Sequence, residues 1–166
     1  MSLLEGTIGS PNHPLTVVEN IAASNDWPFE RSGDNELTII SQGQWTDYQL
    51  SFTWMNEIEA LHLACAFDMK IPVARRAEVQ RLVAAVNEQL WIGHFDLWTQ
   101  NGVIIHRQAL VLPGGLSASA LQCESMLRGA IHACERYYPA FQFVVWAGKS
   151  TSEAMTAAMF DTQGEA

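Results

Sequence analysis

The chain has 166 residues, of which 48% are hydrophobic and 16% are charged, and its net charge is −9 at pH 7. This length and apolar content suit one domain with a substantial core. The whole charge excess lies in residues 1–69, which hold ten acids and one base. Nucleic acids and anionic membranes are therefore disfavoured as partners, because both need clustered lysine and arginine.

The first predicted helix follows an irregular start. Residues 1–13 are expected to be loosely ordered, whereas apolar residues recur at helical spacing over Leu15–Ala23. Three runs with strand-like character come next, at Glu36–Ser41, Trp45–Met55 and Ala60–Asp68.

The second and third of these strands predict a hairpin with a defined register. Closing a four-residue loop between them gives the pairs Trp54 with Leu61, Phe52 with Leu63, Leu50 with Cys65, and Tyr48 with Phe67. Both apolar faces coincide in this register, and a one-residue slip would expose one of them. The opposite face is small and weakly polar, so it is either solvated or covered by another subunit.

A helix is predicted from Pro72 to Trp91, because apolar residues recur along it with helical spacing. Gly93 suits the position just past its end, where a left-handed conformation is common.

Asn101-Gly102 lies between two strand-like runs and predicts a two-residue type I′ turn. Counting back from this turn gives the pairs Gln100 with Val103, Trp98 with Ile105, Asp96 with Arg107, and His94 with Ala109. His106 then points to the opposite face from His94 and Asp96, since side chains alternate along a strand.

Ser119 with Gln122 forms a capping box that predicts a long helix. Pro139 must kink or end that helix. Residues 141–147 are apolar enough for helix or strand, and we predict helix. A final short helix is predicted over residues 150–160.

The element order is α-β-β-β-α-β-β-α-α, with antiparallel hairpins. It predicts an α+β fold with a single curved antiparallel sheet of about five strands and helices packed on it. No linker, repeat or low-complexity segment divides the chain, so we expect one domain over residues 1–166.

The low charged fraction predicts that a partner covers part of the surface. Average proteins carry about 25% charged residues, and we expect a homodimer as well as an unidentified protein partner. The acidic residues 1–69 suit a basic segment of such a partner. Alternatively, their charge only keeps the chain soluble.

Cysteine usage and the start of the chain indicate the compartment. Cys65, Cys123 and Cys134 form no CxxC motif, and reduced cysteines fit the cytoplasm. Cys123 and Cys134 share one predicted helix but stand about 16 Å apart, too far for a disulfide. We also expect no signal peptide, and no apolar run long enough to span a membrane.

Motifs for catalysis or metal binding are missing. The histidines share no short spacing, and one strand face offers only His94 and Asp96, so we expect no metal and no cofactor. No nucleophile elbow and no phosphate-binding loop occurs. We therefore expect no catalytic residues and no enzyme.

A few side chains remain candidates for function. Asp96 and Arg107 are predicted to form a structural pair across the hairpin, although acid–base chemistry by Glu88 and Asp96 is an alternative. Arg75 and Arg76 oppose the dipole at the start of their helix. They are candidate contacts for a partner or an anionic ligand, together with His94 and Trp98.

Four segments resemble the YbjN family of bacterial sensory transduction regulators, and its alphaproteobacterial branch in particular. They are residues 59–68 (EALHLACAFD), Arg75-Arg76, residues 86–98 (VNEQLWIGHFDLW) and residues 134–150 (CERYYPAFQFVVWAGKS). The resemblance runs from about Trp27 to the C-terminus. It implies a fold similar to type III secretion chaperones, usually dimeric, and brings no catalytic residue, metal or cofactor.

Together these observations predict a non-enzymatic bacterial regulatory or chaperone-like module that binds protein and is dimeric. The alternative is a small-ligand sensor or an unrecognised enzyme with a pocket near His94 and Asp96.

Overall fold

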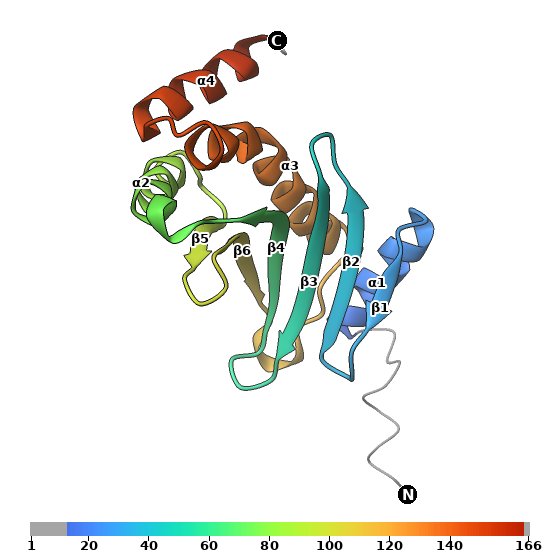
Figure 1. Cartoon of the computed structure of the whole chain (residues 1–166). Coiled ribbons are helices and arrows are strands. Elements are labelled where there is room, and N and C mark those ends of the chain that lie inside the picture. The colour runs from blue at the N-terminus through green and yellow to red at the C-terminus, as the bar shows by residue number, and fades with distance from the viewer. Residues whose placement is uncertain (1–12, 165–166) are drawn as a thin grey trace, which may run out of the picture.

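The computed structural model describes residues 13–164 (Figure 1). Its elements are, in chain order, α1 Pro14–Ser24, β1 Phe29–Arg31, β2 Glu36–Gln42, β3 Asp47–Met55, β4 Ala60–Lys70, α2 Arg76–Asn87, β5 His94–Trp98, β6 Val103–Val111, α3 Ala120–Val145 and α4 Thr151–Gly164. Loose order was expected for residues 1–13, of which residues 1–12 lie outside the described part. His13 is described, and its Nδ1 accepts a hydrogen bond from the Leu15 N–H at the start of α1.

The strands of the described chain form one antiparallel sheet of six strands in the order β1-β2-β3-β4-β6-β5. The predicted α+β class and antiparallel sheet are confirmed, with one strand more than expected. The additional strand, β1, has three residues, and so short a run cannot show alternation in the sequence.

Helices cover one face of this sheet (Figure 1). α3 packs on β4 and β6, and α1 packs on β2, β3 and α3, while α2 and α4 pack against one another and against α3. The core fills the space between these layers, and its central sheet residues are Leu37, Ile39, Leu50, Phe52, Leu61, Leu63 and Cys65. No helix within residues 13–164 covers the other face. We call it the open face, and its central residues are Thr38, Ser51, Thr53, His62, Ala64 and Ala66.

The predicted register of β3 and β4 is confirmed at each of the four pairs, from Trp54 with Leu61 to Tyr48 with Phe67. The alternation of apolar residues was enough to predict this register, because one face of both strands is buried. A slip of one residue would have moved core side chains into water.

The predicted register of β5 and β6 is wrong by two residues. Trp98, and not Gln100, pairs with Val103, so that four residues form the loop and His94 lies opposite Arg107. A type I′ turn needs positive φ at both central residues, and here Gly102 has it (φ 63°) but Asn101 does not. Contacts from outside the hairpin hold the longer loop: the Gly102 carbonyl accepts from the Ile71 N–H. A two-residue shift keeps every side chain on its predicted face.

Three helices differ from their predicted bounds. α2 begins at Arg76, after a 3-10 turn at Val73–Arg75, and not at Pro72, and α4 runs to Gly164 and not to residue 160. α2 ends at Asn87, not Trp91, and the Asn87 side chain bonds both backbone groups of Phe95: Oδ1 accepts from the N–H (2.8 Å) and Nδ2 donates to the C=O (3.0 Å). α3 begins at the predicted capping box and continues through Pro139, so helix is confirmed up to Val145, the end of α3.

Gly93 is expected to tolerate no side chain. Its φ is +73°, and a Cβ would lie 2.6 Å from His106 Cε1, so Gly93→Ala should lower the free energy of unfolding by at least about 1–2 kcal/mol. Gly129→Ala, in α3 where a Cβ meets nothing within 4 Å, is the matched control and should stabilise by about 0.5–1 kcal/mol. Equal effects of the two changes in chemical denaturation would contradict this account.

Candidate functional site

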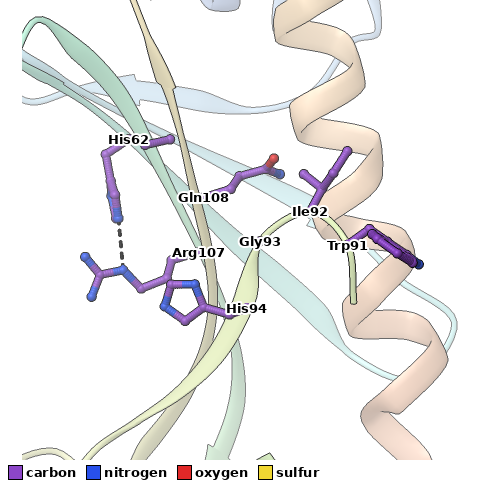
Figure 2. Close-up of a pocket in the computed structure, with 8 residues that line it drawn as sticks. His62, Trp91, Ile92, Gly93, His94, Arg107 and Gln108 are labelled. Carbon is purple, nitrogen blue, oxygen red and sulfur yellow. Dashed lines mark hydrogen bonds between the residues drawn. The ribbon is translucent and has the colours of Figure 1, made fainter. Parts of the chain in front are cut away.

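A pocket of about 460 Å³ opens where β5 begins, between β4, β6 and the loop that follows α2 (Figure 2). Its lining residues are His62, Trp91, Ile92, Gly93, His94, Arg107, Gln108 and Ala109. The volume lies within the range of about 300–1,000 Å³ that is usual for small-ligand sites. This is the region in which the alternative hypothesis placed a pocket.

Arg107 is the centre of a polar network in this pocket. Its Nε donates to His62 Nε2 (3.1 Å), and its Nη1 lies 3.5 Å from Asp96 Oδ2. The same carboxylate oxygen lies 3.2 Å from His94 Nε2. Figure 2 shows His62 and Arg107 pointing toward each other from neighbouring strands. An imidazole that accepts a hydrogen bond must be neutral at that nitrogen.

The environment of His62 keeps its ring neutral. Partial burial, followed by the positive charge of Arg107 and by His94, lowers the pKa of His62 from its ordinary value. His62 therefore acts as a hydrogen-bond acceptor for Arg107 and not as a second positive charge.

The structure assembles this network differently from the sequence prediction. Asp96 contacts Arg107 diagonally, since its directly opposite residue is Ile105, and His94 faces Arg107 instead of Ala109. His62 was not predicted here, because it belongs to the other hairpin and reaches Arg107 only through the pairing of β4 with β6. No local signal in the sequence could have revealed that neighbour.

The rim of the pocket is apolar and exposed. The Trp91 side chain is 100% exposed and that of Ile92 is 74% exposed, although side chains of this size are usually at least partly buried. Trp98, a predicted contact, lies further along β5 on the same face as His94 and Asp96 and is partly exposed.

Arg75 and Arg76, also predicted contacts, are engaged inside the molecule. Arg75 donates from Nε to the Val144 carbonyl (2.9 Å) and from Nη2 to the Lys149 carbonyl (2.9 Å), at the end of α3. Arg76 donates from Nη1 to the Thr99 carbonyl (2.7 Å) in the β5–β6 loop. The carbonyl end of α3 is the negative end of its dipole, and this offsets the unfavourable position of Arg75 before α2.

His106 lies beneath Gly93 on the core side of β6. Its ring is 1% exposed, stands edge-on to Phe95 at 5.1 Å between centroids, and has no hydrogen-bond partner at either nitrogen within residues 13–164. Burial, with a smaller contribution from His94, lowers the pKa of His106 to about 4. His106 is therefore a neutral core residue near pH 7.

The described residues hold no candidate metal centre, no disulfide and no membrane-spanning helix. No group of three His, Cys, Asp or Glu side chains within residues 13–164 could hold a metal ion. The three cysteines are buried and free, with Cys65 and Cys134 in contact at 3.6 Å between sulfurs. Across the same residues, no helix combines the length and apolarity that crossing a bilayer requires.

Comparison with known proteins gives one family. Residues 14–143 match the family YbjN, described as "Putative bacterial sensory transduction regulator". Among solved structures, the chain is similar to that of YbjN, "a putative transcription regulator from E. coli", with a TM-score of 0.54 and 9% identity, over 73% of this chain and 85% of the other. At this identity the similarity shows the fold alone. No curated protein matches.

His106 is expected to make the protein less stable in acid. The pKa of His106 in the folded protein lies below its pKa in the unfolded chain. The free energy of unfolding is therefore highest above about pH 6.5, where the ring is neutral in both states, and it falls as the pH falls toward 4. His106→Leu should remove about 2 kcal/mol of the stability loss between pH 7 and pH 5. Chemical denaturation at both pH values measures this, with exposed His132→Gln as the control. An unchanged pH dependence in His106→Leu would exclude the mechanism.

Arg75 is expected to matter for stability. Arg75→Gln should lower the free energy of unfolding by about 1–3 kcal/mol, because it removes two charged hydrogen bonds to the end of α3. Arg128→Gln is the control, since Arg128 pairs with Glu124 on the exposed side of α3 and such a pair contributes about 0.3–0.5 kcal/mol. Equal losses in the two variants would show that Arg75 is not a structural residue.

Proposed function

The chain belongs to the YbjN family, and we propose that it is a non-enzymatic regulatory protein that binds a basic segment of another protein on its open face. In that sense it is chaperone-like: it holds part of a partner without altering it. The family's description as a regulator supports the regulatory part. The three buried, free cysteines are compatible with the cytoplasm as its compartment.

The observation that carries the proposal is the composition of the open face. Small side chains fill its centre, and exposed apolar side chains stand toward its ends: Ile40, Met55, Trp98 and Val111, each between 40% and 62% exposed. The strand register places all four on the same side as Ser51 and Thr53. Interfaces are enriched in such aromatic and aliphatic residues, and a centre of small residues lets a partner approach closely.

Charge on the open face indicates what kind of partner fits. The strand register places four acids on it, Glu30, Glu36, Asp47 and Asp96, against two bases, Lys70 and Arg107. An acidic surface attracts a basic segment and repels a copy of itself. We therefore retain the homodimer as a proposal but assign it to a surface other than the open face.

Site-specific crosslinking tests the binding surface. A photoreactive residue at Ser51, in the centre of the open face, should give one reproducible protein adduct in the native bacterium, whereas one at the exposed Gln80 of α2 should not. Glu36→Lys should weaken formation of the adduct by about tenfold, because it reverses a charge facing the basic partner. Glu153→Lys, on α4, is the matched control.

Two results would exclude this proposal. One is equal crosslinking from Ser51 and Gln80, and the other is no adduct from Ser51 when light scattering gives the mass of a monomer. A mass of two chains with no adduct would support the homodimer without the protein partner.

A further inference from the structure

We infer that a second copy of this chain covers the surface formed by residues 89–92 and by the face of α3 from Leu121 to Arg136, with Trp91 of each copy seated in a groove of the other. We call this surface the α3 patch. It lies on the side of the sheet that the helices cover, away from the open face. The inference deepens the homodimer of the proposed function, on which it rests, by naming its interface.

Trp91 projects from the molecule without packing against it. Its side chain is 100% exposed and that of the neighbouring Ile92 is 74% exposed. Figure 2 shows the Trp91 ring beside α3, on the far side of Gly93 from Arg107. Covering so large an apolar ring is favourable, and aromatic side chains are enriched in protein interfaces.

A groove of about 270 Å³ lies between residues 89–92 and α3. Small side chains on the helix leave room in it, since Ser125, Gly129 and Ala133 follow one another at intervals of four residues and therefore share a face. A Cβ added at Gly129 would meet nothing within 4 Å. The groove is smaller than the about 300–1,000 Å³ that is usual for small-molecule sites, so it suits a side chain of a protein better than a free ligand.

The α3 patch is complementary to itself, because the protruding ring and the groove lie side by side. A two-fold axis that brings Trp91 of one copy into the groove of the second also brings the second Trp91 into the first groove, and the interface closes. An unrelated partner would need its own ring and groove in matching positions, whereas a second copy has both by symmetry. Leu121, 76% exposed and four residues before Ser125 on α3, extends the apolar area.

The charge of the α3 patch also favours a second copy. The side chains of Glu88, directly before the groove, and of Arg136, which lines it, have no ion pair or hydrogen bond within residues 13–164. The two-fold arrangement brings Glu88 of each copy to Arg136 of the other. The open face, by contrast, carries four acids against two bases and repels a copy of itself.

The loop that carries Trp91 is held in place before a second copy binds. Gly93 has a positive φ and lies against the His106 ring so closely that a Cβ would clash. On the other side of the loop, Asn87 ties the end of α2 to Phe95. A side chain presented by a fixed loop loses less conformational entropy on association, and that raises affinity.

Light scattering on the full chain over a dilution series tests the surface. The unchanged chain should have the mass of two chains and dissociate on dilution. Trp91→Ala, which removes the ring, and Gly129→Glu, which puts a charge in the groove, should each weaken the dimer by at least about tenfold. Trp146→Ala and Gln80→Glu, changes of exposed residues outside the α3 patch, are the matched controls and should leave dissociation unchanged.

A charge exchange tests the two-fold arrangement. Glu88→Arg and Arg136→Glu should each weaken their own dimers, because each places like charges opposite one another. Mixed in equal amounts, the two variants should prefer a dimer with one chain of each, in which both contacts again join opposite charges. Native mass spectrometry resolves this mixed dimer. Glu153→Arg, on α4, mixed with Arg136→Glu is the control and should show no such preference.

Each outcome decides the inference. Loss of the dimer in Trp91→Ala and Gly129→Glu, with preferred mixed dimers, supports it, and Trp91→Ala is informative even if Gly129→Glu perturbs α3, because the exposed ring has no packing to lose. A dimer that withstands both changes, or random mixing of the charge variants, would overturn the inference and leave the proposed homodimer standing. A monomer at every concentration would overturn both. None of these outcomes alters the adduct expected from Ser51, which tests the protein partner separately.

Discussion

The antiparallel pairing of β4 with β6 is the constraint on which both candidate surfaces depend. It joins the strands before α2 to those after it, and makes one sheet with one covered and one open face. It also places Ala64 opposite Arg107, which brings His62 within hydrogen-bond reach of the guanidinium. Joining distant segments costs chain entropy, and burial of Leu61, Leu63 and Cys65 beneath α3 offsets that cost.

The sheet leaves one face without a covering helix within residues 13–164, while one of its edges is closed. β5 is an edge strand, and exposed edges tend to pair with other chains. Here Asn87 bonds to both backbone groups of Phe95 as a neighbouring strand would. A partner that added a strand at this position would have to displace the end of α2. Binding over the open face would need no such rearrangement, and this is why we propose the face, and not the β5 edge, for the protein partner.

Charged residues at the start of α2 join this helix to α3, to the β5–β6 loop and to α4. Arg75 bonds to the end of α3, Arg76 to the loop between β5 and β6, and Glu78 to the start of α4. Glu78 accepts from the Thr151 N–H (2.7 Å) and hydroxyl (2.8 Å), and these hydrogen bonds lower the pKa of its carboxyl to about 2. The sequence made Arg75 and Arg76 candidate contacts for a partner. In the fold, Arg75 and Glu78 satisfy backbone groups at helix ends, and Arg76 satisfies a carbonyl of the β5–β6 loop.

The sequence by itself determined the features that depend on neighbours along the chain. Alternation over Trp45–Met55 and Ala60–Asp68 gave the correct register, and Ser119 with Gln122 marked the start of α3, because these patterns need only local geometry. Tertiary structure decided the rest. The β5–β6 register was set by contacts from Ile71 and Arg76, and the neighbour of Arg107 by a strand from the other hairpin. The physical reason is that turn chemistry and periodicity act over a few residues, whereas strand neighbours and the partners of long charged side chains are chosen by how distant elements pack.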